Sequence, residues 1–263
     1  MNILVCIKQV IDPEIPSSSL RVDDDKNRLV SNHDIAPIIN GFDENALEAA
    51  LRIKDCSEAN VSVLSIGSSF DMNVIKKPLS LGANSLFLVE DDSIDGLDAN
   101  ASAYVLSKAI EKIGPFDLIL CGRQASDWDN GQVPLGISEM LRVPCISNAQ
   151  QIKIDGNNLT VEKVTDNGYQ LLETTLPALI TISNEFGELR YPALRGILAS
   201  GKMSPTIWNL LDLCIDQSRL APKVKVTSLT IPEKNNKCEF VTGQDEVESG
   251  RLLALRLRAA KIL

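Results

Sequence analysis

Short apolar runs alternate with longer amphipathic stretches along the first two-thirds of the chain. The apolar runs, which are rich in β-branched residues, predict strands at residues 3–10, 61–67, 85–89, 116–122 and 176–182. Apolar residues at helical spacing predict helices at residues 43–53, 74–81 and 98–113, and a further one through Ile137 and Leu141. This alternation is typical of a parallel sheet covered by helices.

Two stretches depart from this rhythm. A polar segment after the first strand carries Pro13, Pro16, three serines and an acidic run at residues 23–25, and it predicts a loop or a small hairpin. Residues 151–154, 159–164 and 169–173 predict antiparallel strands joined by tight turns, one of them at residues 155–158.

From residue 183 onward the chain becomes more polar and loses its regular pattern. Short apolar groups occur at residues 194–199, expected to form a helical turn or two, and at 208–213, and a Pro- and Lys-bearing stretch covers residues 222–237. Residues 245–263 predict one amphipathic helix. Because this tail has no compact core of its own, we expect it to wrap a partner, and the alternative is that it folds back on its own sheet.

Composition narrows the function further. The chain has 263 residues, 44% of them hydrophobic, and its 26 Lys+Arg against 35 Asp+Glu give 26 − 35 = −9. This charge argues against a nucleic-acid partner. No apolar run approaches the roughly 18 to 20 residues of a membrane span, and the N-terminal apolar run is too short for a signal peptide. We therefore expect a cytoplasmic protein without membrane insertion.

The cysteines and the single histidine do not suggest catalysis. The six cysteines form no C-x-x-C pair, and several lie in strand-like runs, so buried reduced thiols are expected rather than a metal or redox site. His33 stands among Ser31, Asn32 and Asp34 in what resembles a polar turn, so a histidine-based triad is not expected.

Several common motifs are absent from the sequence. It has no G-x-G-x-x-G after the first strand, no G-x-x-x-x-G-K-[ST] and no G-x-S-x-G. An ATP-using hydrolase or ligase is therefore disfavoured. Asp127 and Asp129 could act as an acid/base pair or hold magnesium, but capping a helix or ordering a ligand is favoured. Trp128 between them either stacks on a flat ring or covers the core.

The polar loop after the fourth predicted strand is the expected ligand site. In open α/β sheets ligands bind beyond the carboxyl ends of the strands, and a helix N-terminus offers unpaired N–H groups to a phosphate. The residues alone thus predict an adenine-nucleotide-sized site with no catalytic acid or base and no metal.

Four segments of the chain match the motifs of one family. They are residues 3–8, with Lys8 at the end of the strand; 40–44, an N-P-[FY]-x-E helix entry with Gly41 at the Pro position; 122–133, of the form G-[RK]-Q-A-x-D-x-D-x-x-Q-[VT]; and 190–194, of the form R-Y-x-x-L. Residues 161–178 add a V-x-R-x-x-D-G-G…L-P-A-like stretch. With these motifs the chain resembles the β subunit of electron-transfer flavoproteins over nearly its whole length.

The resemblance implies a fold and a role. The fold would be an adenine nucleotide α-hydrolase-like parallel-sheet domain at residues 1–182 with an antiparallel extension. Residues 183–263 would form a recognition loop, an extended arm and a C-terminal helix that contact an α subunit. The heterodimer would shuttle electrons between an acyl-CoA-type dehydrogenase and a second redox partner. The α subunit would carry FAD, and this subunit would bind AMP or, in electron-bifurcating members, a second FAD.

The resemblance also implies site residues. Tyr191 and Leu194 would dock the dehydrogenase, with Leu194 as an apolar anchor. The nucleotide would be held by the strand ends, the helix entry and the loop, that is by Cys6, Asn40, Gly41, Phe42, Asp43, Ile66, Gly122, Arg123, Gln124, Ala125, Asp127, Trp128, Asp129, Asn130, Gly131, Gln132 and Val133.

Two questions stay open on the sequence. The Gly122–Ala125 start and Gln132-Val133 favour the bifurcating, FAD-binding pattern, whereas Trp128 and Pro134 depart from it, so AMP and FAD both stay open. The alternative function is a stand-alone adenine-nucleotide-binding regulatory domain of the universal-stress type. The long tail with Leu194 and the terminal helix argues for the electron-transfer subunit, because a self-contained sensor does not need it.

Overall fold

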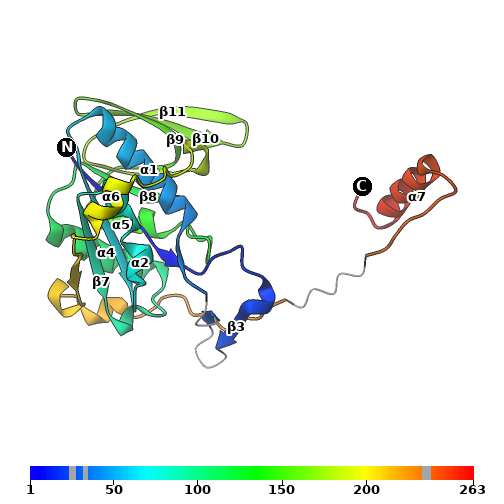
Figure 1. Cartoon of the computed structure of the whole chain (residues 1–263), viewed down its shortest axis with the longest axis horizontal. Coiled ribbons are helices and arrows are strands. Elements are labelled where there is room, and N and C mark those ends of the chain that lie inside the picture. The colour runs from blue at the N-terminus through cyan, green and yellow to red at the C-terminus, as the bar shows by residue number, and fades with distance from the viewer. Residues whose placement is uncertain (24–27, 32–34, 233–237) are drawn as a thin grey trace. The chain divides into compact units, whose positions relative to one another are not determined.

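A mostly parallel β-sheet forms the centre of the first unit of the chain in this computed structural model (Figure 1). The structure describes residues 1–23, 28–31, 35–232 and 238–263. These residues separate into two compact units, Met1–Leu229 and Thr230–Leu263. His33, considered above as a catalytic candidate, and Asp24 and Asp25 of the acidic run lie outside the described residues.

Nine strands of the described chain form the sheet, in the order β11-β10-β9-β12-β8-β1-β6-β7-β13. Neighbouring strands from β9 to β13 in this order run parallel to one another. The central strands are β1 (Asn2–Cys6), β6 (Asn60–Gly67), β7 (Ser85–Glu90), β8 (Leu118–Gly122) and β12 (Ala178–Ile182). Every residue of β8 and β12 is buried, as expected for parallel strands covered on both faces. The α/β class predicted from the sequence is confirmed.

Helices cover both faces of this sheet. Alternation along β1 places Ile3 and Val5 in the core beneath α1 (Gly41–Cys56), and Leu4 and Cys6 in the core beneath α4 (Ala99–Ile113) and α5 (Val133–Leu141). Asp98 caps α4, because its Oδ1 accepts the Ala101 N–H at 2.8 Å. The helix predicted at residues 74–81 is split into α2 (Met72–Ile75) and α3 (Lys77–Leu81), and Pro78 lies in the first turn of the second helix.

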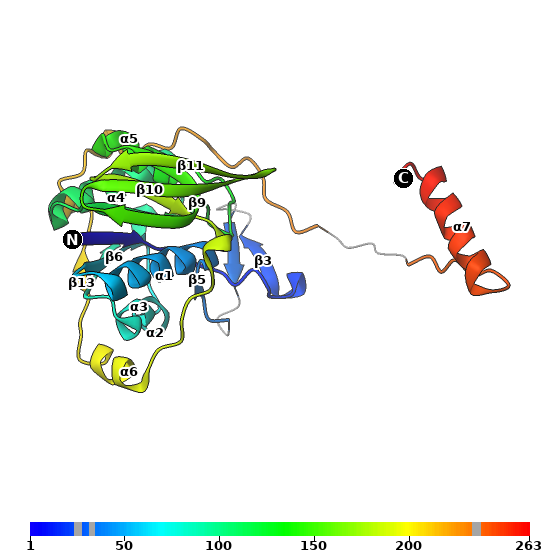
Figure 2. The ribbon, with the colours of Figure 1, turned by 90° about the horizontal axis from the view of Figure 1, so that it is seen from above.

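The antiparallel extension is also confirmed. β9 (Cys145–Asp155), β10 (Asn158–Thr165) and β11 (Gly168–Thr175) lie side by side as a meander (Figure 2). The turn between the first two contains Gly156 in the left-handed region, with φ 57°.

The first predicted strand, residues 3–10, is broken after Cys6. β2 (Gln9–Val10) leaves the large sheet and pairs with β5 (Ile38–Ile39). The break occurs because the Lys8 N–H donates to the Asp43 carboxylate and the Lys8 carbonyl accepts the Asn40 N–H. The hairpin expected after this strand is formed by β3 (Leu20–Asp23) and β4 (Arg28–Ser31).

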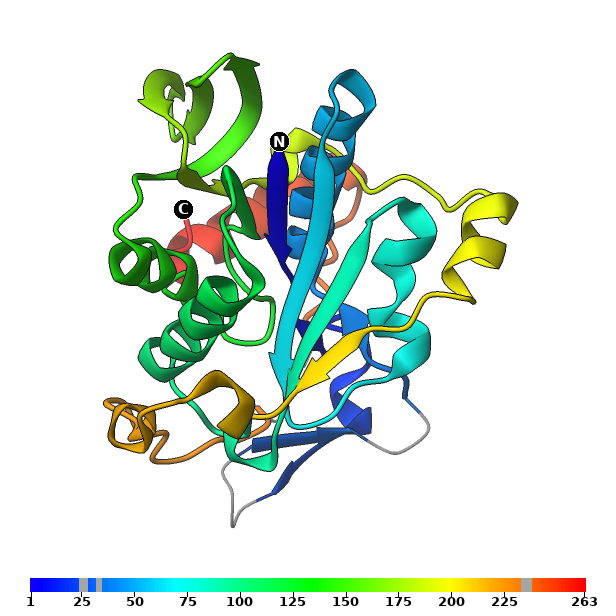
Figure 3. The ribbon, with the colours of Figure 1, turned by 90° about the vertical axis from the view of Figure 1, so that its left-hand side faces the viewer.

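Residues 183–229 fold back on the sheet, which is the alternative that the sequence left open for this part of the tail. After the 3₁₀ turn Asn184–Phe186, the helix α6 (Leu194–Ser200) lies beside α3, and β13 (Thr206–Trp208) pairs with β7 at the sheet edge (Figure 3). Trp208 stacks on Phe87 of β7 with ring centroids 5.4 Å apart. The 3₁₀ turns Leu211–Leu213 and Gln217–Leu220 follow.

The described residues of the second unit form one helix, α7 (Glu246–Ala259), within the predicted 245–263. Asp245 caps it by accepting the Glu248 N–H at 2.7 Å. None of the residues of α7, all of them described, is buried.

The cysteines only partly match the expectation of buried thiols. All six are free; Cys6 and Cys121 are buried and Cys145 is half-buried, but Cys56, Cys214 and Cys238 are exposed, so the expectation is wrong for these three. No helix among the described residues is both long and apolar enough to cross a membrane.

Candidate functional site

The predicted site residues meet at one edge of the sheet. β1 lies between β6 and β8, and all three strands run parallel, so their carboxyl ends converge. Cys6, Ile66 and Gly122 lie at these ends, and Cys6 is directly opposite Cys121. This is the edge at which ligands bind in open α/β sheets.

Asp43, in the first turn of α1, ties two of these strand ends together. Its Oδ2 accepts the Lys8 N–H at 2.7 Å and its Oδ1 accepts the Gly122 N–H at 3.1 Å. Burial raises the pKa of Asp43 to about 7, and the hydrogen bonds from Asn40, Lys8 and Gly122 act in the opposite direction. The buried Asp43 side chain therefore links the start of α1 to the loop that begins at Gly122.

Asn40 holds the next residues of the same loop. It is fully buried, its Nδ2 donates to the Gln124 carbonyl at 2.8 Å, and its Oδ1 accepts the Ser126 N–H at 3.1 Å. Both the nitrogen and the oxygen of the Asn40 side-chain amide are therefore hydrogen-bonded to residues more than eighty positions later in the chain. Since a buried amide needs partners on both groups, Asn40 fixes the loop backbone to the start of α1.

Side chains of the loop itself add further contacts. The Arg123 guanidinium lies over the Phe42 ring, 4.6 Å from its centroid. Gln124 donates from Nε2 to Asp129 Oδ1 at 2.8 Å. Lys8 Nζ and Asp127 Oδ2 form an ion pair at 2.6 Å. The two aspartates thus contact Lys8 and Gln124; neither caps α5, and their predicted role in ordering a ligand stays a prediction.

The end of the loop leads into the N-terminus of α5. Asp129 and Gly131 adopt positive φ angles of 52° and 59°, which turn the chain sharply before the helix. The side chain of the N-cap residue Gln132 makes no capping hydrogen bond, and Pro134 occupies the first turn. A helix start without a side-chain cap presents its N–H groups to an anion.

Unpaired polar atoms gather at this edge. Among the described residues, the buried side-chain N and O atoms without a hydrogen-bond partner are Ser65 Oγ, Arg123 Nε and Ser126 Oγ. Ser65 is next to Ile66 near the end of β6, and the other two are in the loop. Because unpaired buried polar atoms are rare and costly, their concentration here points to a polar ligand.

A cleft lies beside the same contacts. Its volume is about 560 Å³, and its lining includes Asn40, Gly41, Phe42 and Ser126 as well as the acidic Asp12 and Glu14. Ligand pockets for small molecules have volumes of roughly 300 to 1,000 Å³. A second hollow, at the ends of β6 and β7, is lined by Glu90, Asp91 and Asp92.

The structure separates the predicted site residues into two groups. Hydrogen bonds, an ion pair and a ring contact link the helix entry, through Asn40, Phe42 and Asp43, to the loop and to Lys8. Cys6 and Ile66 instead belong to the core on the opposite face of the sheet, together with Val133. The Cys121 thiol lies beside Cys6, and the hydrogen bond to Cys6 together with burial raises its pKa well above the usual value.

Trp128 is 51% exposed, so the indole does not close this edge of the sheet. Two polar residues that we did not include among the predicted nucleotide contacts also lie here, Lys8 and Ser126. The sequence could have identified both residues, because each lies inside one of the segments that match the family motifs.

The predicted docking residues are on the surface. Tyr191 is 96% exposed and Leu194, the first residue of α6, is 72% exposed. Ile197 and Leu198 of the same helix are also exposed. Such a group of apolar side chains is typical of a protein–protein contact.

The helix-covered, mostly parallel sheet with a loop-to-helix junction at its carboxyl edge defines an α/β protein. A family model described as the electron transfer flavoprotein domain matches residues 28–212. The chain is 35% identical to the electron transfer flavoprotein subunit beta of Thermoanaerobacterium thermosaccharolyticum over 267 residues, with 100% of both chains covered. It belongs to the electron transfer flavoprotein family, among the β subunits.

Other relatives agree with this membership. The chain is 37% identical to the electron transfer flavoprotein subunit beta of Megasphaera elsdenii over 205 residues, 75% of this chain and 74% of that one. It is 31% identical over 268 residues to the caffeyl-CoA reductase-Etf complex subunit CarD of Acetobacterium woodii, with 100% of both chains covered. The resemblance seen in the sequence is confirmed.

Proposed function

We propose that this chain is one half of a heterodimer that shuttles electrons between an acyl-CoA-type dehydrogenase and a second redox partner. In this role it binds AMP or a second FAD at the loop of residues 122–133. The proposal of a nucleotide site rests on two buried polar atoms without a hydrogen-bond partner, Arg123 Nε and Ser126 Oγ. Both lie in the loop that Asn40 and Asp43 hold in place.

The residues present suit either nucleotide, because FAD contains an AMP moiety. The start of α5 supplies N–H groups for a phosphate, and the unpaired Ser126 hydroxyl and Arg123 Nε supply hydrogen bonds. Cys6 and Ile66 lie at the adjacent strand ends but pack in the core on the other face of the sheet, so they do not carry this proposal. The exposed position of Trp128 leaves both nucleotides possible.

When bound, FAD supplies the electron chemistry by accepting and releasing electrons. The residues of this chain hold and orient the nucleotide, and they offer surfaces to two proteins. No proton transfer by a side chain of this subunit is part of the proposal.

The second unit supports a contact with an α subunit that carries FAD. Val247, Leu253 and Leu255 of α7 are 82%, 47% and 50% exposed. Apolar side chains on a helix without a buried face are favourable only when another protein covers them. A stand-alone nucleotide sensor would gain nothing from this helix. We place the heterodimer in the cytoplasm.

Leu194 provides the test of electron delivery. The chain is co-expressed with the α subunit, and the flavin absorbance of the purified complex is followed without oxygen while butyryl-CoA and butyryl-CoA dehydrogenase are added. We expect the dehydrogenase to reduce the flavin. Leu194→Ala should slow this reduction by about tenfold or more, since an exposed anchor at the centre of an interface is worth roughly 2 kcal/mol.

Leu211→Ala is the matched control, because Leu211 is 79% exposed, close to the 72% of Leu194, and lies on a different element. Its rate should equal that of the unaltered complex, and reduction by dithionite should be the same in all three proteins. A flavin that stays oxidised in the unaltered complex while the dehydrogenase reduces an artificial acceptor would contradict the proposed function.

A further inference from the structure

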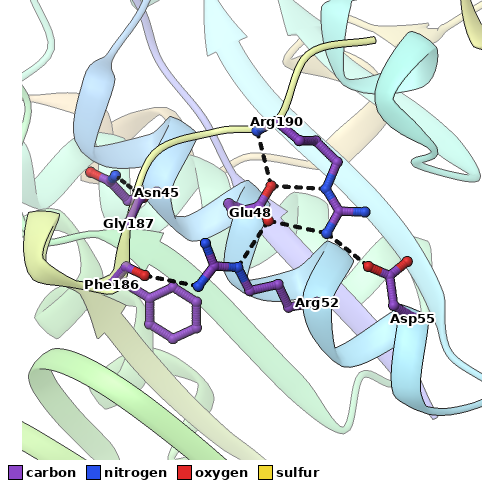
Figure 4. Close-up of polar contacts among 7 residues, drawn as sticks. All are labelled: Asn45, Glu48, Arg52, Asp55, Phe186, Gly187 and Arg190. Carbon is purple, nitrogen blue, oxygen red and sulfur yellow. Dashed lines mark hydrogen bonds and ion pairs between the residues drawn. The ribbon is translucent and has the colours of Figure 1, made fainter. Parts of the chain in front are cut away.

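The residue directly before the docking segment is anchored to the sheet-covering helix α1 (Figure 4). Arg190 donates from Nε to Glu48 Oε2 at 3.0 Å and from Nη2 to Glu48 Oε1 at 3.1 Å. Its backbone N–H also donates to Glu48 Oε2 at 3.1 Å, and its Nη2 lies 2.8 Å from Asp55 Oδ2. Both the side chain and the main chain of Arg190 are therefore fixed.

Glu48 is an unusual partner because it is only 4% exposed. A buried carboxylate is stable only when it is paired and fully hydrogen-bonded. Burial raises the pKa of Glu48, but the hydrogen bonds from Arg190 and Arg52 outweigh it and bring the pKa below the ordinary value. The carboxylate thus stays charged and holds both arginines.

The segment before Arg190 is attached to the same helix. Arg52 donates from Nη1 to the Phe186 carbonyl at 3.0 Å, and its guanidinium lies over the Phe186 ring. Asn45 Nδ2 donates to the Gly187 carbonyl at 2.6 Å. Gly187 has a φ of 118°, a backbone conformation that residues with a side chain rarely adopt, so glycine is favoured here.

A second anchor follows the docking residues. A Cβ on Gly196 of α6 would lie 2.1 Å from the Ser80 carbonyl oxygen, so the backbones of α6 and α3 are in direct contact. Tyr191 and Leu194 lie between these two anchors and are nevertheless exposed. The segment that carries them has fixed ends and side chains that point to solvent.

We propose that Arg190 is a positioning residue, whose ion pair with Glu48 presets Tyr191 and Leu194 in the conformation that the dehydrogenase binds. This inference rests on the proposed function. A segment ordered before binding loses less conformational entropy on binding than a flexible one, so the anchor increases affinity without touching the partner. It would also keep the apolar side chains from collapsing onto the protein surface.

The test compares three variants of the co-expressed complex: Arg190→Ala, Arg190→Lys and Lys108→Ala. Lysine keeps the charge but cannot form the two-point contact with Glu48. Lys108 pairs with Glu111 on α4, on the other face of the sheet, and serves as control for loss of a surface cation. Hydrogen exchange reports on residues 184–200, and flavin reduction by butyryl-CoA dehydrogenase gives KM for the dehydrogenase and kcat.

In Arg190→Ala, exchange in residues 184–200 should become faster and KM should rise about tenfold with kcat unchanged, because the segment must then be ordered when the dehydrogenase binds. Arg190→Lys should fall between this variant and the unaltered complex, and Lys108→Ala should match the latter. A purely structural role would instead lower the flavin content or kcat.

Two results would overturn the inference while leaving the proposed function intact: unchanged exchange in Arg190→Ala, or faster exchange with an unchanged KM. If the dehydrogenase does not reduce the flavin of the unaltered complex, the proposed function fails and the positioning role fails with it.

Discussion

Replacing Gly122 by alanine probes the contact on which the loop geometry depends. Gly122 ends β8, and a Cβ at this position would lie 2.4 Å from Asp43 Oδ1, 2.7 Å from the Phe42 carbonyl carbon and 2.8 Å from the Asp43 nitrogen. Two of these atoms belong to the backbone of α1, so rotation of one side chain does not relieve the overlap. Either the end of β8 or the start of α1 must move.

The expected loss has two parts. Inserting a methyl group into a packed contact costs about 1 to 3 kcal/mol. The movement also breaks the hydrogen bond from the Gly122 N–H to Asp43, and an unmade bond to a buried carboxyl group costs about 1.5 to 3 kcal/mol. We expect the free energy of unfolding to fall by about 3 to 5 kcal/mol, which corresponds to a decrease in Tm of about 10 °C for a unit of this size.

Chemical denaturation followed by circular dichroism measures this loss. Gly41→Ala is the control, because Gly41 lies at the start of α1 and a Cβ there has nothing within 4 Å. Its free energy of unfolding should be unchanged or higher by up to about 1 kcal/mol. Equal stability of Gly122→Ala and the unaltered chain would refute the close contact between loop and helix.

Two further substitutions test the residues that hold the loop. Burial raises the pKa of Asp43 to about 7 from its ordinary 3.8, so the folded state binds this proton more tightly and stability falls as pH rises toward 7. Between pH 5 and 7 the free energy of unfolding should therefore decrease by at most about 1.4 kcal/mol per pH unit, and Asp43→Asn should abolish this decrease. Denaturation at several pH values in this range measures it. Parallel curves of stability against pH for the two proteins would contradict the prediction. Asn40→Ala leaves the Gln124 carbonyl and the Ser126 N–H unpaired and should cost about 2 to 4 kcal/mol, with faster hydrogen exchange in residues 122–133. Asn73→Ala is the control, because Asn73 is exposed. Equal hydrogen exchange in residues 122–133 of the two variants would contradict the role of Asn40 in holding the loop.

Much of the fold could be predicted because its signals are local. The strands of the parallel sheet are short apolar runs, and α1 and α4 have long, regular apolar faces. The loop of residues 122–133 was recognisable because polar residues follow a fully buried strand directly. Its role in binding a nucleotide stays a prediction.

Contacts between distant residues could not be predicted in this way. The first strand breaks near Lys8 because its N–H bonds to Asp43, and nothing in residues 3–10 signals that bond. β13 is three residues long, too short for a pattern, and pairs with β7, where Trp208 stacks on Phe87. The arginines that surround Glu48 come from its own helix and from a segment more than one hundred residues later.

The nucleotide and flavin content of the complex tests the central claim most directly. The chain is co-expressed with the α subunit, the complex is purified, and FAD and AMP released by denaturation are counted per heterodimer by absorbance and chromatography. We expect two nucleotides per heterodimer, either one FAD with one AMP or two FAD. In Gly122→Ala the nucleotide of this subunit should be lost while the FAD of the α subunit is retained. Failure to form a complex, or a complex without flavin, would contradict the account and favour a stand-alone nucleotide-binding domain.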